Sequence, residues 1–132
     1  MARFYDIDTA NERLTELRPL LESLRNDRAE LADAQREFRE LLASDGLPDA
    51  DAHIPEREAQ VREIVRRMGQ NVARIDAWGI TLRDIRSGLV DFPALVSGRQ
   101  VWLCWRVDEP EVGWWHEVTT GFGGRQRLRD LT

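Results

Sequence analysis

Two side chains in the C-terminal part of the sequence are of types that could do acid–base chemistry, Asp91 and His116. Asp91 lies in the otherwise apolar run Leu89–Phe92, and a buried carboxylate needs a partner. His116 could supply one, and so could an arginine such as Arg99 or Arg125. An Asp–His pair could serve a hydrolase-like enzyme, but no nucleophile or oxyanion-binding loop accompanies it in the sequence. We expect Asp91 and His116 to form a structural polar pair, keep acid–base catalysis as the less favoured alternative, and assign no catalytic residue.

Cys104 is the only cysteine, so an internal disulfide, a CxxC redox pair and a multi-cysteine zinc site are excluded. In the predicted strand register, Cys104 and His116 point to opposite faces of a sheet. They could then neither share a metal ion nor act as a Cys–His nucleophile. The chain has no lysine, which excludes Schiff-base chemistry and a P-loop lysine. We therefore expect a buried thiol, no metal site and no cofactor.

Aromatic and charged side chains gather on one face of a predicted hairpin, where Trp102 and Arg106 lie across from Trp115 and Glu117. The outer face of a two-sided sheet is expected to be polar, so the presence of two indole rings there needs an explanation. Arg125 follows in a glycine-rich tail that could hold an anion, although the tail does not lead into a helix N-terminus. These five side chains could form a binding site for a small ligand or peptide. The alternative, which we favour, is a buried subunit contact.

A long helix is predicted to position the N-terminal half, starting at a capping box over Thr9–Glu12 and ending near Ser44. Pro19 should kink or break this helix, because it removes an amide donor and crowds the preceding turn. Apolar residues recur at helical and heptad spacing: Leu14, Leu17, Leu21, Leu24, Leu31, Phe38 and Leu42.

A second helix should follow the acidic loop Gly46–His53, with Pro55 in its first turn and Gly79 as its left-handed C-cap. Its apolar stripe consists of Val61, Ile64, Val65, Met68, Val72 and Ile75. With a loop of this length the two helices pair antiparallel, and residues 10–20 of the first overhang the second. We expect the apolar face of the following sheet to cover that overhang.

The last third of the chain changes to strand-like alternation. The predicted strands are Ile80–Arg83, Leu89–Phe92, Val101–Val107 and Val112–Val118. A turn over Asp108–Glu111 makes the last two a hairpin. The expected register pairs Val107 with Val112, Trp105 with Trp114, Leu103 with His116 and Val101 with Val118. The overhang would then be covered by Val101, Leu103, Trp105, Trp114 and Val118.

The predicted fold class is therefore α+β, a long, coiled-coil-like antiparallel helical hairpin followed by a small, mostly antiparallel sheet. We expect one domain over residues 1–132, with the hairpin in 1–79 and the sheet in 80–132. Two helices alone cannot bury stripes this wide, which indicates self-association, with a dimer as the simplest case.

Several runs in the C-terminal half resemble the bacterial family catalogued as domain of unknown function 2203. The runs are Gly88–Pro93, Leu103–Arg106, Glu109, Trp115–His116, and Gly121–Phe122 with Arg125. The leucine-rich segment Leu17–Leu20 is similar too, so the resemblance covers nearly the whole chain. It implies a small cytosolic bacterial protein with no established activity, and it transfers no catalytic residue.

The charge distribution argues against a nucleic-acid partner. The first 79 residues carry 12 arginines and 17 acidic residues, and the remainder carries seven of each, so no basic excess marks either part. No stretch reaches the length of a transmembrane helix, and Met1–Asp6 lacks the apolar core of a signal peptide, so a cytoplasmic protein is expected. An oligomerising interaction or structural protein is the favoured function, with a protein partner as a further possibility. A ligand-binding module and a hydrolase-like enzyme are the alternatives.

Overall fold

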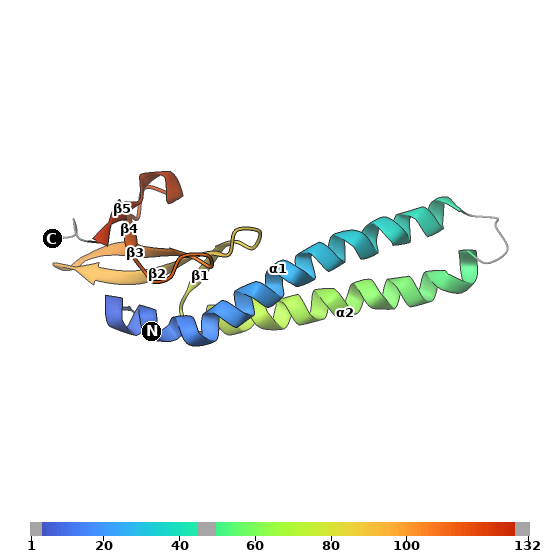
Figure 1. Ribbon diagram of the computed structural model, residues 1–132, viewed down its shortest axis with the longest axis horizontal. Helices are drawn as coiled ribbons and strands as arrows, with labels where there is room; N and C mark the ends of the chain where they lie inside the picture. Colours follow the sequence, from blue (N-terminus) through green and yellow to red (C-terminus); the bar gives the residue numbers. More distant parts are fainter. Residues whose placement is uncertain (1–3, 45–49, 129–132) are drawn as a thin grey trace.

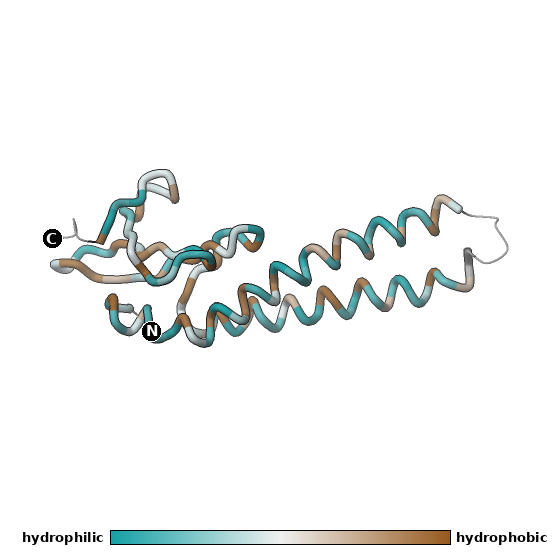
Figure 2. Tube along the Cα trace, viewed as in Figure 1, coloured by the Kyte–Doolittle hydropathy of each residue, from teal (hydrophilic) through white to brown (hydrophobic). Residues whose placement is uncertain are grey.

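The computed structural model describes residues 4–44 and 50–128 and has the predicted α+β architecture. Helices α1 (Ile7–Ala43) and α2 (Ala50–Ala77) form a long antiparallel hairpin. Figure 1 shows the sheet at one end of this hairpin, over the N-terminal part of α1, while the other end extends away from it. Figure 2 shows apolar and polar residues alternating in short stretches along both helices, as expected for helices with one buried stripe.

Helix α1 starts three residues earlier than predicted. Asp6 is the N-cap: its carboxylate accepts from the amide of Thr9 at 2.8 Å, and the hydroxyl of Thr9 accepts from the amide of Asp6 at 3.0 Å. Thr9 does belong to a capping box, but it is the third residue of the helix and not the N-cap. The C-terminus lies as predicted, with Ser44 as the C-cap.

Both helices contain a proline in their interior. Helix α1 runs through Pro19 without the break that was one of the two expected outcomes. Leu17, Leu20 and Leu21 on either side of it are buried, and this packing outweighs one missing hydrogen bond. Helix α2 begins at Ala50, so Pro55 lies inside the helix and not in its first turn as predicted. The loop predicted over 46–53 lies partly outside the described residues, and its end belongs to α2.

A five-stranded antiparallel sheet follows, with its strands in chain order. Gly79 ends the second helix with a φ of +75°, as predicted for a left-handed C-cap. The strands are β1 (Thr81–Asp84), β2 (Leu89–Val96), β3 (Arg99–Arg106), β4 (Trp114–Glu117) and β5 (Gln126–Arg127), with a short 3₁₀ turn η1 (Phe122–Gly124) before the last. Every neighbouring pair is antiparallel.

The predicted register between β3 and β4 is wrong by one residue. Leu103 pairs with Trp115 and not with His116, and Trp102 pairs with His116. Because side chains alternate between faces, this one-residue difference moves every side chain of β4 to the face opposite to the predicted one. Trp115 therefore lies on the inner face, which packs on α1, and His116 lies on the outer face.

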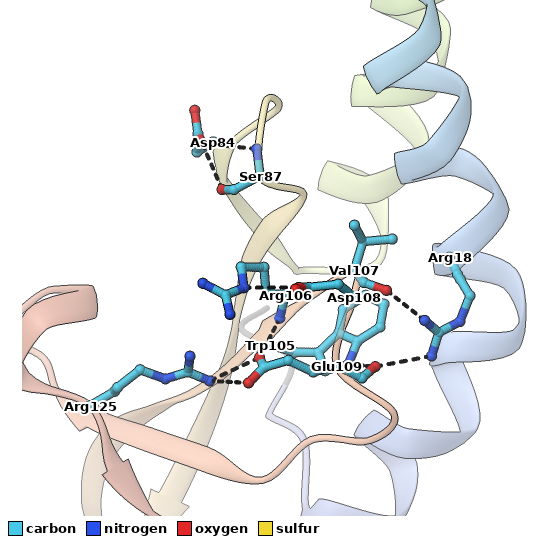
Figure 3. Close-up of polar contacts among 9 residues, drawn as sticks. All are labelled: Arg18, Asp84, Ser87, Trp105, Arg106, Val107, Asp108, Glu109 and Arg125. Atoms are coloured by element: carbon cyan, nitrogen blue, oxygen red, sulfur yellow. Dashed lines mark hydrogen bonds and ion pairs between the residues drawn. The ribbon is translucent and has the colours of Figure 1, made fainter.

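Contacts of the β3–β4 loop with α1 explain the register. The amide of Val112 donates to the side chain of Asn11 at 2.8 Å, so Val112 packs toward the helix instead of pairing with Val107. Arg18 donates to the carbonyl oxygens of Val107 at 2.6 Å and Glu109 at 3.3 Å. Figure 3 shows Arg18 and Arg125 reaching this loop from opposite sides. Sequence distance hides these contacts, because they join residues about ninety to a hundred positions apart.

Glu109 is the central residue of that loop. Its carboxylate accepts from the amide of Arg106 at 2.8 Å and from Arg125 through both oxygens at 2.9 Å (Figure 3). Its carbonyl oxygen accepts from the indole of Trp105 at 3.1 Å. One residue thus ties together the end of β3, helix α1 and the segment before β5.

The inner face of the sheet covers the N-terminal part of α1, which confirms the expected cover of the overhang. The helix contributes Ala10, Leu14, Leu17, Leu20, Leu21 and Leu24 to the core, and the sheet contributes Val90, Phe92, Val101, Leu103, Trp105 and Trp115. Trp115 takes the place predicted for Trp114, and Val118, predicted to join the cover, is 52% exposed. Tyr5 adds an edge-to-face contact with Phe92 at 5.1 Å between ring centroids.

Ion pairs add to the contacts between the two helices, between Arg57 and Glu37 at 2.8 Å near the end away from the sheet and between Arg67 and Asp27 at 3.1 Å midway along the hairpin. Leu31 and Phe38, predicted to lie on the apolar stripe of the first helix, are only partly buried. In the described residues, neither helix has a stretch that is long and apolar enough to cross a membrane.

Candidate functional site

Three neighbouring strands bring Asp91, Cys104 and His116 together on the outer face. Asp91 of β2 pairs with Cys104 of β3, and on the other side of β3 Trp102 pairs with His116 of β4. Each of the three side chains is buried, and their potential ligand atoms all lie within 4.8 Å of one another. We call these residues the polar cluster. The prediction that Cys104 and His116 face opposite ways is wrong, because it depended on the shifted register.

Asp91 and His116 are in direct contact. The Nε2 atom of His116 lies 3.0 Å from both carboxylate oxygens of Asp91, and its Nδ1 atom lies 2.9 Å from the carbonyl oxygen of Glu117. A neutral imidazole has one N–H and could donate to only one of these acceptors. The ring therefore lies between two acceptors inside the sheet, and both contacts are hydrogen bonds only when the ring carries two protons.

Arg83 is the second partner of Asp91, and the sequence reasoning missed it. Its Nε donates to Asp91 Oδ2 at 2.8 Å, and its guanidinium lies 5.0 Å from the centre of the Trp102 ring. Arg99 and Arg125, the two arginines considered from the sequence, pair with other acids. Strand alternation alone could not have found Arg83, because this residue lies where the register of β1 with β2 shifts, between Leu82 and Asp84.

Cys104 is a poor nucleophile in this environment. Burial, and then the neighbouring charge of Asp91, raises the pKa of the Cys104 thiol to about 12. Only the thiolate attacks, so a Cys–His nucleophile at neutral pH is disfavoured by this shift rather than by the opposite orientations that the sequence suggested.

A cavity of about 250 Å³ lies over the polar cluster. Its wall has a cationic part, Arg83, and an apolar part formed by Leu89, Val118 and Phe122. Thr120 and Gly121 of the segment after β4 complete it. Phe122 and Val118 are 39% and 52% exposed, so the apolar wall is in contact with water. We call this space the outer cavity.

The five side chains predicted to form a binding face do not lie together. Trp115 and Glu117 pair with inner-face residues of β3, and Trp115 is only 5% exposed. Trp102 and Arg106 lie on the outer face as predicted, and Arg125 reaches it through Trp114, with its guanidinium 4.5 Å from that ring centre.

Trp114 therefore replaces Trp115 in an outer-face group of aromatic rings and arginines. The guanidinium of Arg127 lies 4.8 Å from the ring centre of Trp114. Those of Arg106 and Arg125 lie 5.4 Å and 4.6 Å from the ring centre of Phe122. The charges of Arg106 and Arg125 are also paired with Asp108 and Glu109 at 2.9 Å, respectively. These stacked arginines border the outer cavity through Phe122.

Comparisons with known proteins give a family and no activity. A family model described as "Uncharacterized conserved protein (DUF2203)" matches residues 3–128. No curated protein and no solved structure matches the chain.

Proposed function

From the premise that the chain belongs to the DUF2203 family of uncharacterized conserved proteins, we propose that it binds a small anionic ligand in the outer cavity. The observation that carries this proposal is Arg83, which is held at the cavity wall by two contacts that leave donors available. Its Nε donates a hydrogen bond to Asp91, and its guanidinium lies over the ring of Trp102. Within the described residues its two Nη atoms make no hydrogen bond, so they can donate to a carboxylate or phosphate oxygen.

The rest of the cavity limits the size and shape of the ligand. A volume of about 250 Å³ lies below the usual range for drug-sized ligands, about 300–1,000 Å³. Leu89, Val118 and Phe122 would contact an apolar part of the ligand next to its anionic group. The ligand class is thus a small carboxylate or phosphate monoester with a short apolar portion.

In this proposal Asp91 and His116 form the polar floor of the site and not a catalytic pair. His116 already faces an acceptor at each ring nitrogen, which leaves neither nitrogen free to exchange a proton with a ligand. We place the binding activity in the cytoplasm, where the thiol of Cys104 is kept reduced.

The test is a thermal-shift titration with a panel of small carboxylates and phosphate monoesters, each matched by its neutral amide or alcohol. Members of the panel that fit should raise the melting temperature, and Arg83→Gln should abolish the rise. Arg86→Gln is the matched control, because Arg86 is an exposed arginine of the following turn that does not line the cavity. A rise that persists in Arg83→Gln, or none with any anion, would contradict the proposal.

Exposed apolar residues on α2 support a second candidate function, self-association with a second copy of the chain. Val65 and Val72, seven residues apart on α2, are 51% and 36% exposed, while Leu31 and Phe38 on the apolar stripe of α1 remain only partly buried. Another hairpin packed as a coiled coil would cover residues with this spacing.

Sedimentation at micromolar concentration tests this candidate. A dimer is expected for the unmodified chain, and Val65→Asp combined with Val72→Asp should give a folded monomer. Leu95→Asp, at a similarly exposed apolar residue of β2, is the control and should leave the dimer intact. A stably folded monomer of the unmodified chain would remove self-association as a function.

A further inference from the structure

We propose that Asp91, Cys104 and His116 form a binding site for one divalent transition-metal ion of the zinc class. The expectation of no metal site rested on a register that places Cys104 and His116 on opposite faces, and the structure places them on the same face. Sulfur, imidazole nitrogen and carboxylate oxygen are the three donor types that zinc takes from proteins. Three protein ligands with a fourth position open are the usual arrangement of a zinc site that binds a further ligand.

The distances in the polar cluster lie within about an ångström of those around a tetrahedral ion. Ligands at about 2.0–2.3 Å from a tetrahedral centre lie about 3.3–3.6 Å from one another. In the structure the nitrogen of His116 lies 3.0 Å from each carboxylate oxygen of Asp91, and all ligand atoms of the cluster lie within 4.8 Å. Shifts of an ångström or so, within the reach of side-chain rotation, would place the three atoms around one ion.

Neighbouring groups orient two of the ligands in the way that metal sites require. The Nδ1 atom of His116 donates to the carbonyl oxygen of Glu117 at 2.9 Å, which turns Nε2 toward the cluster. Arg83 donates to Oδ2 of Asp91 at 2.8 Å, and Oδ1 is then left to coordinate. Such outer partners fix the tautomer of a ligating histidine and the orientation of a ligating carboxylate.

Proton release accompanies binding at these ligands. The ion forms bonds to Nε2 of His116, Sγ of Cys104 and a carboxylate oxygen of Asp91, and the protons that Nε2 and Sγ carried leave to solvent.

The fourth position would face the outer cavity, because the polar cluster forms its floor. Water or an anionic ligand could occupy it. The metal site shares its location with the proposed anion site, but its argument does not depend on that proposal.

Cobalt(II) is the probe, because its spectrum reports both the geometry and the ligands of a zinc-class site. The full-length protein, freed of metal with a chelator and then exchanged into chelator-free buffer, is titrated with cobalt(II). We expect saturation at one equivalent, visible absorption of tetrahedral intensity, and a sulfur-to-cobalt charge-transfer band in the near ultraviolet. Zinc added afterwards should displace the cobalt and remove both features.

Variants identify the ligands. Cys104→Ser should remove the charge-transfer band, and His116→Gln should abolish stoichiometric binding. His53→Gln is the matched control, since His53 is the only other histidine and lies exposed on α2, and it should bind cobalt like the unmodified chain. Circular dichroism checks that each variant is folded. The band in the unmodified chain needs no variant for its assignment, because Cys104 is the only source of a thiolate.

Two outcomes would overturn the proposal: no stoichiometric binding by the unmodified chain, or a cobalt spectrum without the charge-transfer band. Either result would leave the cluster as a hydrogen-bonded Asp91–His116 pair next to a buried thiol. The anion experiment is read separately. An Arg83-dependent thermal shift without cobalt binding would support the anion site and contradict the metal site. Cobalt binding without a thermal shift by any anion would support the metal site and contradict the anion site.

Discussion

Asp91 is the residue on which the outer-face cluster depends most. Its carboxylate is 3% exposed and accepts hydrogen bonds from Arg83 and His116. Removing the negative charge leaves Arg83 and the buried ring of His116 without their anionic partner, and breaking a buried pair costs much more than the pair itself contributes.

We therefore expect Asp91→Asn to lower the free energy of unfolding of the metal-free protein by about 3 kcal/mol, measured by urea denaturation. Asp108→Asn is the control, because its pair with Arg106 is exposed and its loss should change little. Equal, small effects of the two substitutions would show that the buried carboxylate of Asp91 contributes no more to stability than an exposed one.

Asp6 gives a second residue-scale prediction, for pH. Hydrogen bonds from the amide and then the hydroxyl of Thr9 hold the pKa of Asp6 below its ordinary value. A lowered pKa in the folded state means that the ionised cap stabilises the fold above the ordinary pKa, and that this contribution is lost as the pH falls through the lowered one. Asp6→Ala should thus lower the melting temperature at pH 7, and the difference from the unmodified chain should shrink as the pH falls below the ordinary range of aspartate pKa values. Asp8→Ala, in the same first turn but outside the cap, should show no such convergence.

At the scale of elements, the β1–β2 turn is closed by a glycine that packs directly on Val107, the residue that follows β3. Gly88 has a φ of +67°, and a Cβ atom there would lie 2.5 Å from a methyl carbon of Val107. The carbonyl of Gly88 also accepts from the amide of Val107 at 3.0 Å. The turn has therefore little room to move away, and β3 carries both the core and Cys104.

Gly88→Ala should lower the free energy of unfolding by about 2–5 kcal/mol, combining left-handed strain with overpacking against Val107. Gly98 is the matched control: its φ is +79°, but a Cβ atom there would meet nothing within 4 Å. Gly98→Ala should cost only the strain, about 1–2 kcal/mol. If urea denaturation shows the same loss of unfolding free energy for the two variants, the close contact with Val107 contributes nothing to the cost of Gly88→Ala.

At the scale of the whole molecule, the hairpin and the sheet depend on one shared core. Leu17 is fully buried among residues of both parts, and Arg18 and Asn11 hydrogen-bond from the same helix to the β3–β4 loop. The N-terminal part of α1 therefore belongs structurally to the sheet as much as to the hairpin.

Leu17→Ala should cost about 2–5 kcal/mol and loosen both parts. Hydrogen exchange should rise in residues 10–24 and also in residues 101–118. Leu42→Ala, at a 49% exposed position far from the sheet, is the control and should leave the strands protected. Faster exchange confined to residues 10–24 would mean that the two parts are stabilised independently.

Local periodicity was enough to predict the class and approximate limits of the two helices and of the first four strands, but not the short strand β5. Leucines three and four residues apart define the face of α1 whatever lies against it, and Gly79 ends the second helix through its own backbone freedom. The overhang of α1 and its apolar cover followed from helix lengths alone. The places of Pro19 and Pro55 in the helices were predicted less well. A buried apolar stripe compensates for a missing hydrogen bond, and helix propensities take no account of burial.

The candidate site is the part that only the tertiary structure decided. Asp91, Cys104 and His116 were each noticed in the sequence, but whether they meet depends on the register of β3 and β4, and alternation fits two adjacent registers almost equally well. Asn11, Arg18 and Glu109 select the register through contacts with the connecting loop, across as many as 101 positions of the chain. The sequence by itself thus determined which elements form and which residue types they carry. The contacts between distant segments decided which of those residues share a face, because a shift of one residue exchanges the two faces of a strand.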